Sequence, residues 1–228
     1  MEPQRYKFNH NAISAEEQSV LKDKHVFVAG CGGLGGYVIE SLARLGVGRI
    51  TVVDGDVFEE SNLNRQLLSS SMNLGKPKVR AAQQRIQAVN PLVSVDARQV
   101  FINEENASEL IKGSDVVVDC LDTIPSRFVL QAAARKAGIP LVHGAVAGWY
   151  GHVCTIQPGE DTLNEIYGHS EAVKGIEGET GNLAFTVAYV ASIQAAETVK
   201  LLLNRGSGIK GLLQVDLLNQ VVENIPLL

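Results

Sequence analysis

A glycine-rich turn, Gly30-Cys31-Gly32-Gly33-Leu34-Gly35, constrains the fold of this chain more than any other feature. The turn follows the apolar run His25–Ala29, which is typical of a buried strand, and it precedes Gly35–Leu45, whose apolar residues share one helical face. Glycines in this context let the backbone approach a phosphate closely, and the start of a helix offers free N–H donors. The pattern therefore predicts a nucleotide-binding strand–turn–helix unit.

Strand and helix patterns alternate through the first two-thirds of the chain. We predict strands at His25–Ala29, Arg49–Val53, Val93–Ala97, Asp115–Asp119 and Ile139–His143, and further helices at Lys78–Asn90 and Ser126–Lys136. Strands that are apolar throughout are buried on both faces, as in parallel sheets covered by helices. We therefore predict an α/β, Rossmann-like fold with a mainly parallel sheet and helices on both of its faces.

The pattern changes after residue 144. His152–Ile156 and Leu212–Asp216 are predicted strands of a more antiparallel C-terminal part, with a long helix at Leu183–Leu203 between them. The polar, glycine-rich stretch 157–182 has no clear periodicity and is predicted to be a mobile crossover loop. No linker separates two domains, so we expect residues 1–228 to form a single domain, with residues 1–24 as an N-terminal helical arm.

Charge and cysteine content argue against several classes of protein. The net charge of −5 provides no basic surplus for binding nucleic acid. The three cysteines, Cys31, Cys120 and Cys154, are widely spaced, which indicates neither a disulfide framework nor a zinc site. The N-terminus has no apolar signal segment, and Gln194, Glu197 and Lys200 interrupt the longest apolar stretch. We expect a cytoplasmic protein without a membrane span.

An acidic residue ends the second predicted strand. Asp54 is placed to accept hydrogen bonds from a ribose diol, as in dinucleotide-binding folds. Taken alone, the glycine turn and Asp54 favour an NAD-dependent enzyme.

The loop that follows reverses this preference. Ser61-Asn62-Leu63-Asn64-Arg65-Gln66 brings amides and a guanidinium beyond the second strand, and Lys76 and Lys78 begin the next helix. A triphosphate requires several such donors, whereas NAD carries less phosphate charge. The alternative is that Asn62 and Asn64 cap a turn and that the three cations are solvated at the surface.

A second acidic motif, Asp119-Cys120-Leu121-Asp122, ends another predicted strand. Ligands of open α/β sheets bind along this edge, so Asp122 is a candidate to bind Mg²⁺ against the triphosphate, with Arg127 nearby. The alternative is that Asp122 caps the helix after Pro125; the two roles are compatible. We expect Asp119 to be structural.

Together these motifs resemble the MoeB/ThiF/HesA family, the bacterial relatives of ubiquitin-activating enzymes. The matching stretches are Arg5-Tyr6, Gly30–Gly35, Asp54 and Asp56, Ser61–Gln66, Gly75–Val79, Asp119–Asp122, Pro140–Ala145 and Ser192–Glu197. They cover nearly the whole chain. The resemblance implies ATP-dependent adenylylation of the C-terminal glycine carboxylate of a ubiquitin-like sulfur-carrier protein, with pyrophosphate released and sulfur later supplied by a persulfide donor protein.

The resemblance also implies residue roles. Arg65, Lys78 and Asp122 would act in catalysis, with Asp122 binding Mg²⁺, and Arg5 would reach the triphosphate of the partner subunit in a homodimer. The residues implied to bind ATP are Gly30, Gly32, Gly33, Leu34, Gly35, Asp54, Asp56, Asn62, Arg65, Gln66, Lys78 and Asp122.

The chain departs from the family in its cysteines. Many relatives bind zinc with two CxxC pairs, but the place of the first pair reads Asp161–Ile166 here, so we predict no zinc. The stretch 174–182 lacks the cysteine that thioester-forming relatives use, so the reaction is expected to stop at the adenylate. Because an ionised carboxylate needs no general base, we expect His143, His152 and His169 to be structural or surface residues.

Three other functions remain open at this point. The first is a tRNA threonylcarbamoyladenosine dehydratase-like enzyme of the same superfamily, which the acidic composition disfavours. The second is an NAD-dependent oxidoreductase, which would leave Arg65, Lys78 and Asp122 without a purpose. The third is an inactive nucleotide-binding relative. The carrier could belong to thiamine, molybdopterin or a related sulfur-transfer biosynthesis.

Overall fold

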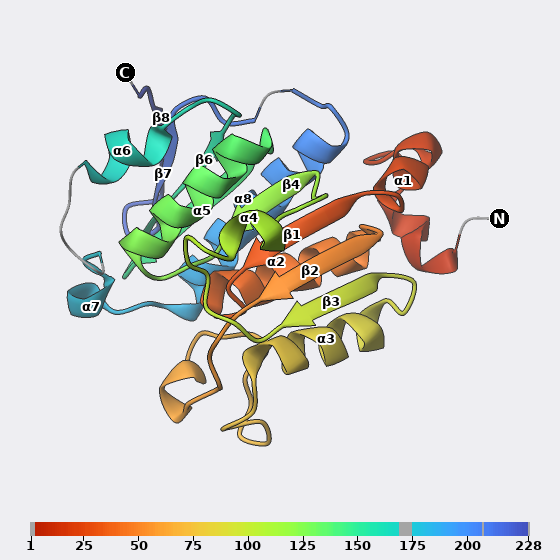
Figure 1. The fold of residues 1–228 in the computed structure, drawn as a ribbon, viewed down its shortest axis with the longest axis horizontal. Helices are drawn as coiled ribbons and strands as arrows, with labels where there is room; N and C mark the ends of the chain where they lie inside the picture. Colours follow the sequence, from red (N-terminus) through yellow and green to blue (C-terminus); the bar gives the residue numbers. More distant parts are fainter. Residues whose placement is uncertain (1–2, 169–174, 207, 228) are drawn as a thin grey trace.

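A single eight-stranded sheet forms the centre of the molecule (Figure 1). The computed structural model describes residues 3–168, 175–206 and 208–227. The strands are β1 (His25–Ala29), β2 (Arg49–Val53), β3 (Ser94–Arg98), β4 (Val116–Asp119), β5 (Leu141–Ala147), β6 (Tyr150–Ile156), β7 (Leu212–Asp216) and β8 (Val221–Ile225). Their order across the sheet is β3-β2-β1-β4-β5-β6-β7-β8.

The sheet changes direction at β5. Neighbours from β3 to β5 are parallel, whereas β5 to β8 pair antiparallel. This confirms the predicted mainly parallel sheet with an antiparallel C-terminal part. β8 was not predicted from the sequence, and β5 continues beyond the predicted end at His143 to Ala147.

Helices cover both faces of the sheet, as predicted. The longer helices are α2 (Gly33–Leu45), α3 (Lys78–Val89), α5 (Ile124–Ala137) and α8 (Ala184–Leu202). The short ones are η1 (Gln4–Asn9), α1 (Ala15–Leu21), η2 (Glu60–Asn62), α4 (Ala107–Leu110), α6 (Thr162–Tyr167) and α7 (Glu177–Thr180). Residues of α2, α3 and α8 pack in one apolar core, and residues of α4, α5 and α6 pack in another on the opposite face.

Local signals explain where these helices begin and end. Ser14 begins α1 with a capping box to Glu17, and Gly138 ends α5 in the left-handed conformation with φ 69°. None of the described helices has both the length and the apolar character needed to cross a membrane.

The stretch predicted as a mobile crossover loop contains two short helices in its described parts, α6 and α7. The absence of a clear periodicity therefore did not mean an absence of helix, since segments this short hardly display a period. The mobility of 157–182 stays a prediction.

Candidate nucleotide-binding site

The glycine turn joins β1 to α2 at the carboxyl edge of the parallel strands. Gly30 has φ 93°, and a Cβ at this position would lie 2.6 Å from the carbonyl oxygen of Cys120. A Cβ at Gly35 would lie 1.9 Å from the carbonyl oxygen of Gly30. Gly32 is the N-cap of α2 and no side chain caps it, so the first helical turn keeps N–H groups for an anion.

Asp54 connects this turn to the loop after β2. One carboxylate oxygen accepts the N–H of Cys31 at 2.7 Å, and the other accepts the N–H of Asp56 at 2.8 Å. Burial raises the pKa of Asp54, while the Lys78 cation and the two N–H donors oppose the rise. Each oxygen keeps a lone pair, so the predicted contact with a ribose remains compatible with this geometry and stays a prediction.

Of the two predicted phosphate-binding lysines, Lys76 and Lys78, only Lys78 lines the cleft that the glycine turn borders. It is the first residue of α3, is 7% exposed, and its Nζ donates to Oδ2 of Asp56 at 3.0 Å. Lys76 is exposed and does not line the cleft, as in the surface alternative. Lys78 and Asp56, which lie far apart in the sequence, therefore form an ion pair in the wall of the cleft.

The residues of the 61–66 segment serve different purposes. Asn62 caps η2, because its Oδ1 accepts the N–H of Glu59 at 3.0 Å, and it does not line the cleft. This is the capping role that the sequence analysis gave as the alternative. Contact of Asn62 with a triphosphate stays a prediction, and its position outside the cleft lining does not favour it. Asn64 donates to the carbonyl oxygen of Asn182 at 3.2 Å.

Arg65 and Gln66 do line the cleft. Nη1 of Arg65 donates to the carbonyl oxygen of Ser61 at 3.0 Å and to Oδ1 of Asn64 at 2.9 Å, which leaves other guanidinium donors for an anion. Gln66 is buried beside Gly32, and its Oε1 has no partner among the described residues. An unpaired buried acceptor is costly, so Gln66 is suited to a ligand that brings a donor.

Asp122 is exposed in the cleft, three residues beyond the end of β4. The alternative in which Asp122 caps this helix does not hold, because the N-cap of α5 is Thr123, whose hydroxyl donates to Ser126. Arg127 is buried and also lines the cleft. Its donors go to the carbonyl oxygen of Leu121, at 3.2 and 2.8 Å, and to the hydroxyl of Tyr167.

The structure gathers most of the predicted residues around one cleft of about 450 Å³. Those present are Gly30, Gly32, Gly33, Leu34, Asp54, Asp56, Arg65, Gln66, Lys78 and Asp122. Gly35 lies beneath them and presses against Gly30. The volume suits a small ligand, and the start of α2 lines the same cleft as Arg65 and Lys78.

Sequence reasoning missed one apolar wall of this cleft. Val100, Phe101 and Ile102 follow β3 and line the cleft, and a Cβ at Gly55 would lie 2.6 Å from the Phe101 ring. The signal was available, since three apolar residues after a strand and outside any helix pattern are unusual. Val146, Asn182 and Val187 line another part of the cleft.

Arg5 lies away from the cleft of its own chain. Nη1 donates to Oδ1 of Asn90 at 2.8 Å, at the C-terminal end of α3, whereas Lys78 at the opposite end of the helix lines the cleft. Arg5 is exposed there. A contact with the nucleotide of a partner subunit stays a prediction.

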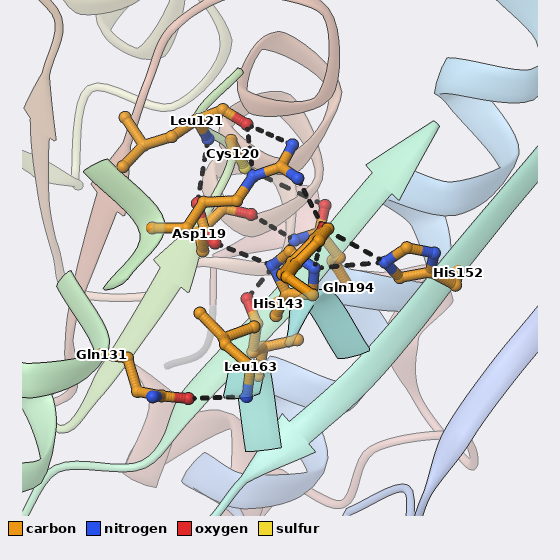
Figure 2. A network of polar contacts seen from close by, with 11 residues as sticks. Asp119, Cys120, Leu121, Gln131, His143, His152, Leu163 and Gln194 are labelled. Carbon is orange, nitrogen blue, oxygen red and sulfur yellow. Dashed lines mark hydrogen bonds and ion pairs between the residues drawn. The ribbon is translucent and has the colours of Figure 1, made fainter. Parts of the chain in front are cut away.

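His143 and His152 form part of a buried polar network instead of the cleft wall. Nδ1 of His143 lies 2.7 Å from Oδ2 of Asp119, and both side chains are fully buried (Figure 2). Burial lowers the pKa of His143, and it lowers the pKa of His152 to about 3, so both rings are neutral. These positions agree with a structural role for both histidines and for Asp119; His169 lies outside the described residues.

The donor set fits Mg²⁺ delivered with a triphosphate. In the described part of the chain, no group of three or more His, Cys, Asp or Glu side chains could hold a metal ion by itself. Mg²⁺ in nucleotide sites uses one or two carboxylates, phosphate oxygens and water. Asp122 supplies one exposed carboxylate at the cleft, whose lining also includes the uncapped start of α2. Zinc-free folding stays a prediction.

A family model and several relatives match this chain. The ThiF family model matches residues 6–227. The chain is 37% identical to a SAMP-activating enzyme E1 of Haloferax volcanii over 94% of this chain and 80% of that protein. It is 39% identical to a sulfur carrier protein adenylyltransferase of Thermus thermophilus, over 87% and 76%. It is 34% identical to a molybdopterin-synthase adenylyltransferase of Escherichia coli, over 85% and 79%.

Solved structures share the fold at lower identity. A crystal structure of E. coli MccB with ATP superposes with a TM-score of 0.84 at 21% identity, over 99% of this chain and 72% of that chain. A structure of TcdA (CsdL) gives a TM-score of 0.75 at 23% identity, over 89% and 95%. These likenesses concern the arrangement of the sheet and helices.

Proposed function

The chain belongs to the ThiF family, and from that premise we propose that it uses ATP to adenylylate the C-terminal carboxylate of a ubiquitin-like sulfur-carrier protein. The relatives at 34 to 39% identity that span most of this chain carry names of such activating enzymes. The observation that carries the proposal is the convergence of the glycine turn, Arg65, Lys78 and Asp122 on one cleft.

The cleft has the groups that this reaction requires. A carboxylate is ionised at neutral pH, so it can attack the α-phosphorus without a general base. The charge that develops on the departing pyrophosphate requires cations and N–H donors, which Arg65, Lys78 and the first turn of α2 supply. Mg²⁺ bound at Asp122 would neutralise part of the same charge.

The remaining wall of the cleft is where we propose that the carrier tail lies. Val146, Asn182 and Val187 come from β5, the end of the crossover and α8. Asn182 is fixed on this wall, because its carbonyl oxygen accepts from Asn64 and its neighbour Gly181 accepts the N–H of Gly148. We place the extended C-terminal tail of the carrier along these three residues, with its carboxylate directed toward the start of α2.

Two finer points belong to the proposal. Arg5 is exposed at the far end of α3, which supports an action on the cleft of a second subunit and hence a homodimer. The three cysteines are free thiols, which agrees with a reducing cytoplasm.

Carrier-dependent ATP–pyrophosphate exchange tests the proposed function. Exchange is expected with a carrier that ends in Gly-Gly, and not with the same carrier lacking these two residues, with tRNA alone, or with NAD in place of ATP. Exchange driven by tRNA would overturn the proposal in favour of the dehydratase-like alternative.

Two substitutions test the site. Arg65→Ala and Asp122→Ala are each expected to lower exchange by a factor of about 100 or more. The first removes a cation that stabilises the departing pyrophosphate, and the second removes the carboxylate that would hold the Mg²⁺ that does so. Lys76→Ala is the matched control, since this lysine is exposed outside the cleft and should leave exchange unchanged. Full exchange in either cleft variant, with folding verified by circular dichroism, would contradict the assignment.

A further inference from the structure

The backbone just before Asp122 is fixed by a buried polar network. The carboxylate of Asp119 accepts from Nδ1 of His143 at 2.7 Å through one oxygen and from the N–H of Leu121 at 3.0 Å through the other. The carbonyl oxygen of Asp119 accepts from Nε2 of Gln194 at 2.8 Å (Figure 2). The turn that leads into the cleft is therefore held from the sheet and from α8.

The network closes through α6. Nε2 of His143 lies 3.0 Å from the hydroxyl of Tyr167, and the same hydroxyl accepts from Nη1 of Arg127 at 2.5 Å. Arg127 donates in turn to the carbonyl oxygen of Leu121. Because a carboxylate only accepts, Nδ1 of His143 carries the proton, so its Nε2 is an acceptor for the Tyr167 hydroxyl at 3.0 Å. Nε2 of His152 lies 3.3 Å from this nitrogen and 3.4 Å from the hydroxyl and is the longer alternative partner of each. Each bond in this ring thus has one donor and one acceptor.

The ring restrains one residue from both sides. The N–H of Leu121 is held by Asp119, and its carbonyl oxygen is held by Arg127. The next residue is Asp122, whose carboxylate reaches the cleft. We infer that Tyr167, together with His143 and Arg127, is a positioning residue for the Asp122 carboxylate in metal and nucleotide binding. The inference rests on the proposed function, which assigns Mg²⁺ to Asp122.

The hydroxyl of Tyr167 is itself placed by a fixed helix. Gln131 of α5 accepts the N–H of Leu163 at 2.9 Å and donates to the carboxylate of Asp161 at 2.7 Å, so the start of α6 is joined to α5. Tyr167 ends the same helix. Buried polar groups are costly unless fully paired, and a fully paired network restrains its members to one arrangement. An arrangement of this kind suits a site whose ligand must be held within a fraction of an ångström.

Tyr167→Phe is the clean test, because it removes the hydroxyl and keeps the ring that packs against Phe128. Two affinities are measured: that of ATP without metal, by calorimetry, and that of Mn²⁺ for the complex with a non-hydrolysable ATP analogue, by electron paramagnetic resonance. Groups that orient a metal ligand change metal affinity by about 10- to 100-fold when removed. We expect at least a 10-fold loss of Mn²⁺ affinity, with metal-free ATP binding unchanged. Tyr37→Phe, in α2, is the matched control and should change neither affinity.

Unchanged Mn²⁺ affinity in Tyr167→Phe would overturn the inference. An equal loss of metal-free ATP binding would also overturn it, since the hydroxyl would then support the whole cleft and not Asp122 in particular. If this variant does not fold, His143→Asn provides the same test, because it keeps a donor toward Asp119 and removes the acceptor of Tyr167. Asp122→Ala distinguishes failure of the proposed function from failure of this inference. If Asp122→Ala keeps full Mn²⁺ affinity, the proposed assignment of the metal to Asp122 is wrong. If Asp122→Ala loses Mn²⁺ affinity and Tyr167→Phe does not, only the inference about Tyr167 is wrong.

Discussion

The central parallel strands and the antiparallel edge of the sheet differ in burial. β1 and β4, in the parallel half, are buried along their whole length, whereas β8, at the antiparallel edge, is mostly exposed. The groups assigned to the nucleotide come from the parallel half, and two of the three residues on the proposed path of the carrier, Asn182 and Val187, follow β6. On the proposed assignment, the parallel half would bind the small ligand and the antiparallel half would present a surface to the carrier protein.

The largest effect is expected where the glycine turn is most closely packed. Gly35→Ala would place a Cβ 1.9 Å from the carbonyl oxygen of Gly30, a backbone atom that cannot move without displacing the glycine turn. We expect either loss of the fold or ATP binding weakened by a factor of about 100 or more, measured by thermal unfolding and calorimetry.

Gly36→Ala is the control for this substitution. Its Cβ would lie 3.4 Å from Leu68 Cγ, the flexible part of a side chain, so folding and ATP binding should be close to wild type. If Gly35→Ala bound ATP as well as Gly36→Ala, the close packing of the glycine turn would not matter for the nucleotide.

A smaller and more selective effect is expected in the antiparallel half. Trp149 is 41% exposed, its ring lies 4.9 Å from that of Phe185, and Phe185 is two residues from Val187 in the cleft. Exposed aromatic residues often dominate protein interfaces. Trp149→Ala should raise the KM for the carrier about 10-fold and leave the Kd for ATP unchanged, as measured by exchange kinetics and calorimetry.

Leu92→Ala serves as the control, because this leucine is also exposed but lies just after α3, at the end of that helix remote from the cleft. If Trp149→Ala lowered the affinity for ATP, the two halves of the sheet would not bind nucleotide and carrier separately.

The cysteines should matter little in either half. Burial raises the pKa of the thiols of Cys31, Cys120 and Cys154, so none provides a thiolate nucleophile at neutral pH. Each Cys→Ala variant is expected to keep exchange within about threefold of wild type. An exchange reaction abolished in one of them would indicate a covalent intermediate on that sulfur.

The smallest effect is expected in the crossover. Gly178 lies in α7, and a Cβ there would meet no atom within 4 Å. Gly178→Ala should leave exchange unchanged and alter the free energy of unfolding by at most about 1 kcal/mol, measured in denaturant. A large loss of exchange would show that this helix contacts a ligand or the carrier.

The difference between buried central strands and an exposed edge strand also explains which strands the sequence could predict. Buried parallel strands are continuous apolar runs, so β1 and β2 coincide with their predicted ranges. β8 (Val221–Ile225) mixes apolar and polar residues at an exposed edge, where burial imposes no pattern, and it was missed. β5 extends beyond its predicted end because Gly144 does not terminate it; a Cβ there would lie 2.5 Å from Gln194, so the glycine serves packing between β5 and α8.

The sequence could predict those parts of the site that lie close to a strand end. The glycine turn and Asp54 follow strands directly and Asp122 lies three residues beyond one, so the edge on which they meet follows from the fold. The partner of a side chain does not follow in this way: Asp56 with Lys78, or Tyr167 with His143, depend on three-dimensional packing between distant segments. Asn62 shows the same limit, since an amide after a strand suits a cap and a phosphate contact equally well.

The ion pair between Lys78 and Asp56 has a consequence for selectivity. Because the ammonium group already has a counterion, a weak anion such as inorganic phosphate must compete with a neighbouring carboxylate before it gains anything from this lysine. A more highly charged ligand that reaches several donors at once can outcompete Asp56. If Lys78 binds the triphosphate as proposed, the carboxylate of Asp56 would compete with every incoming anion, and this competition would favour nucleotides with a long phosphate chain over simple phosphates.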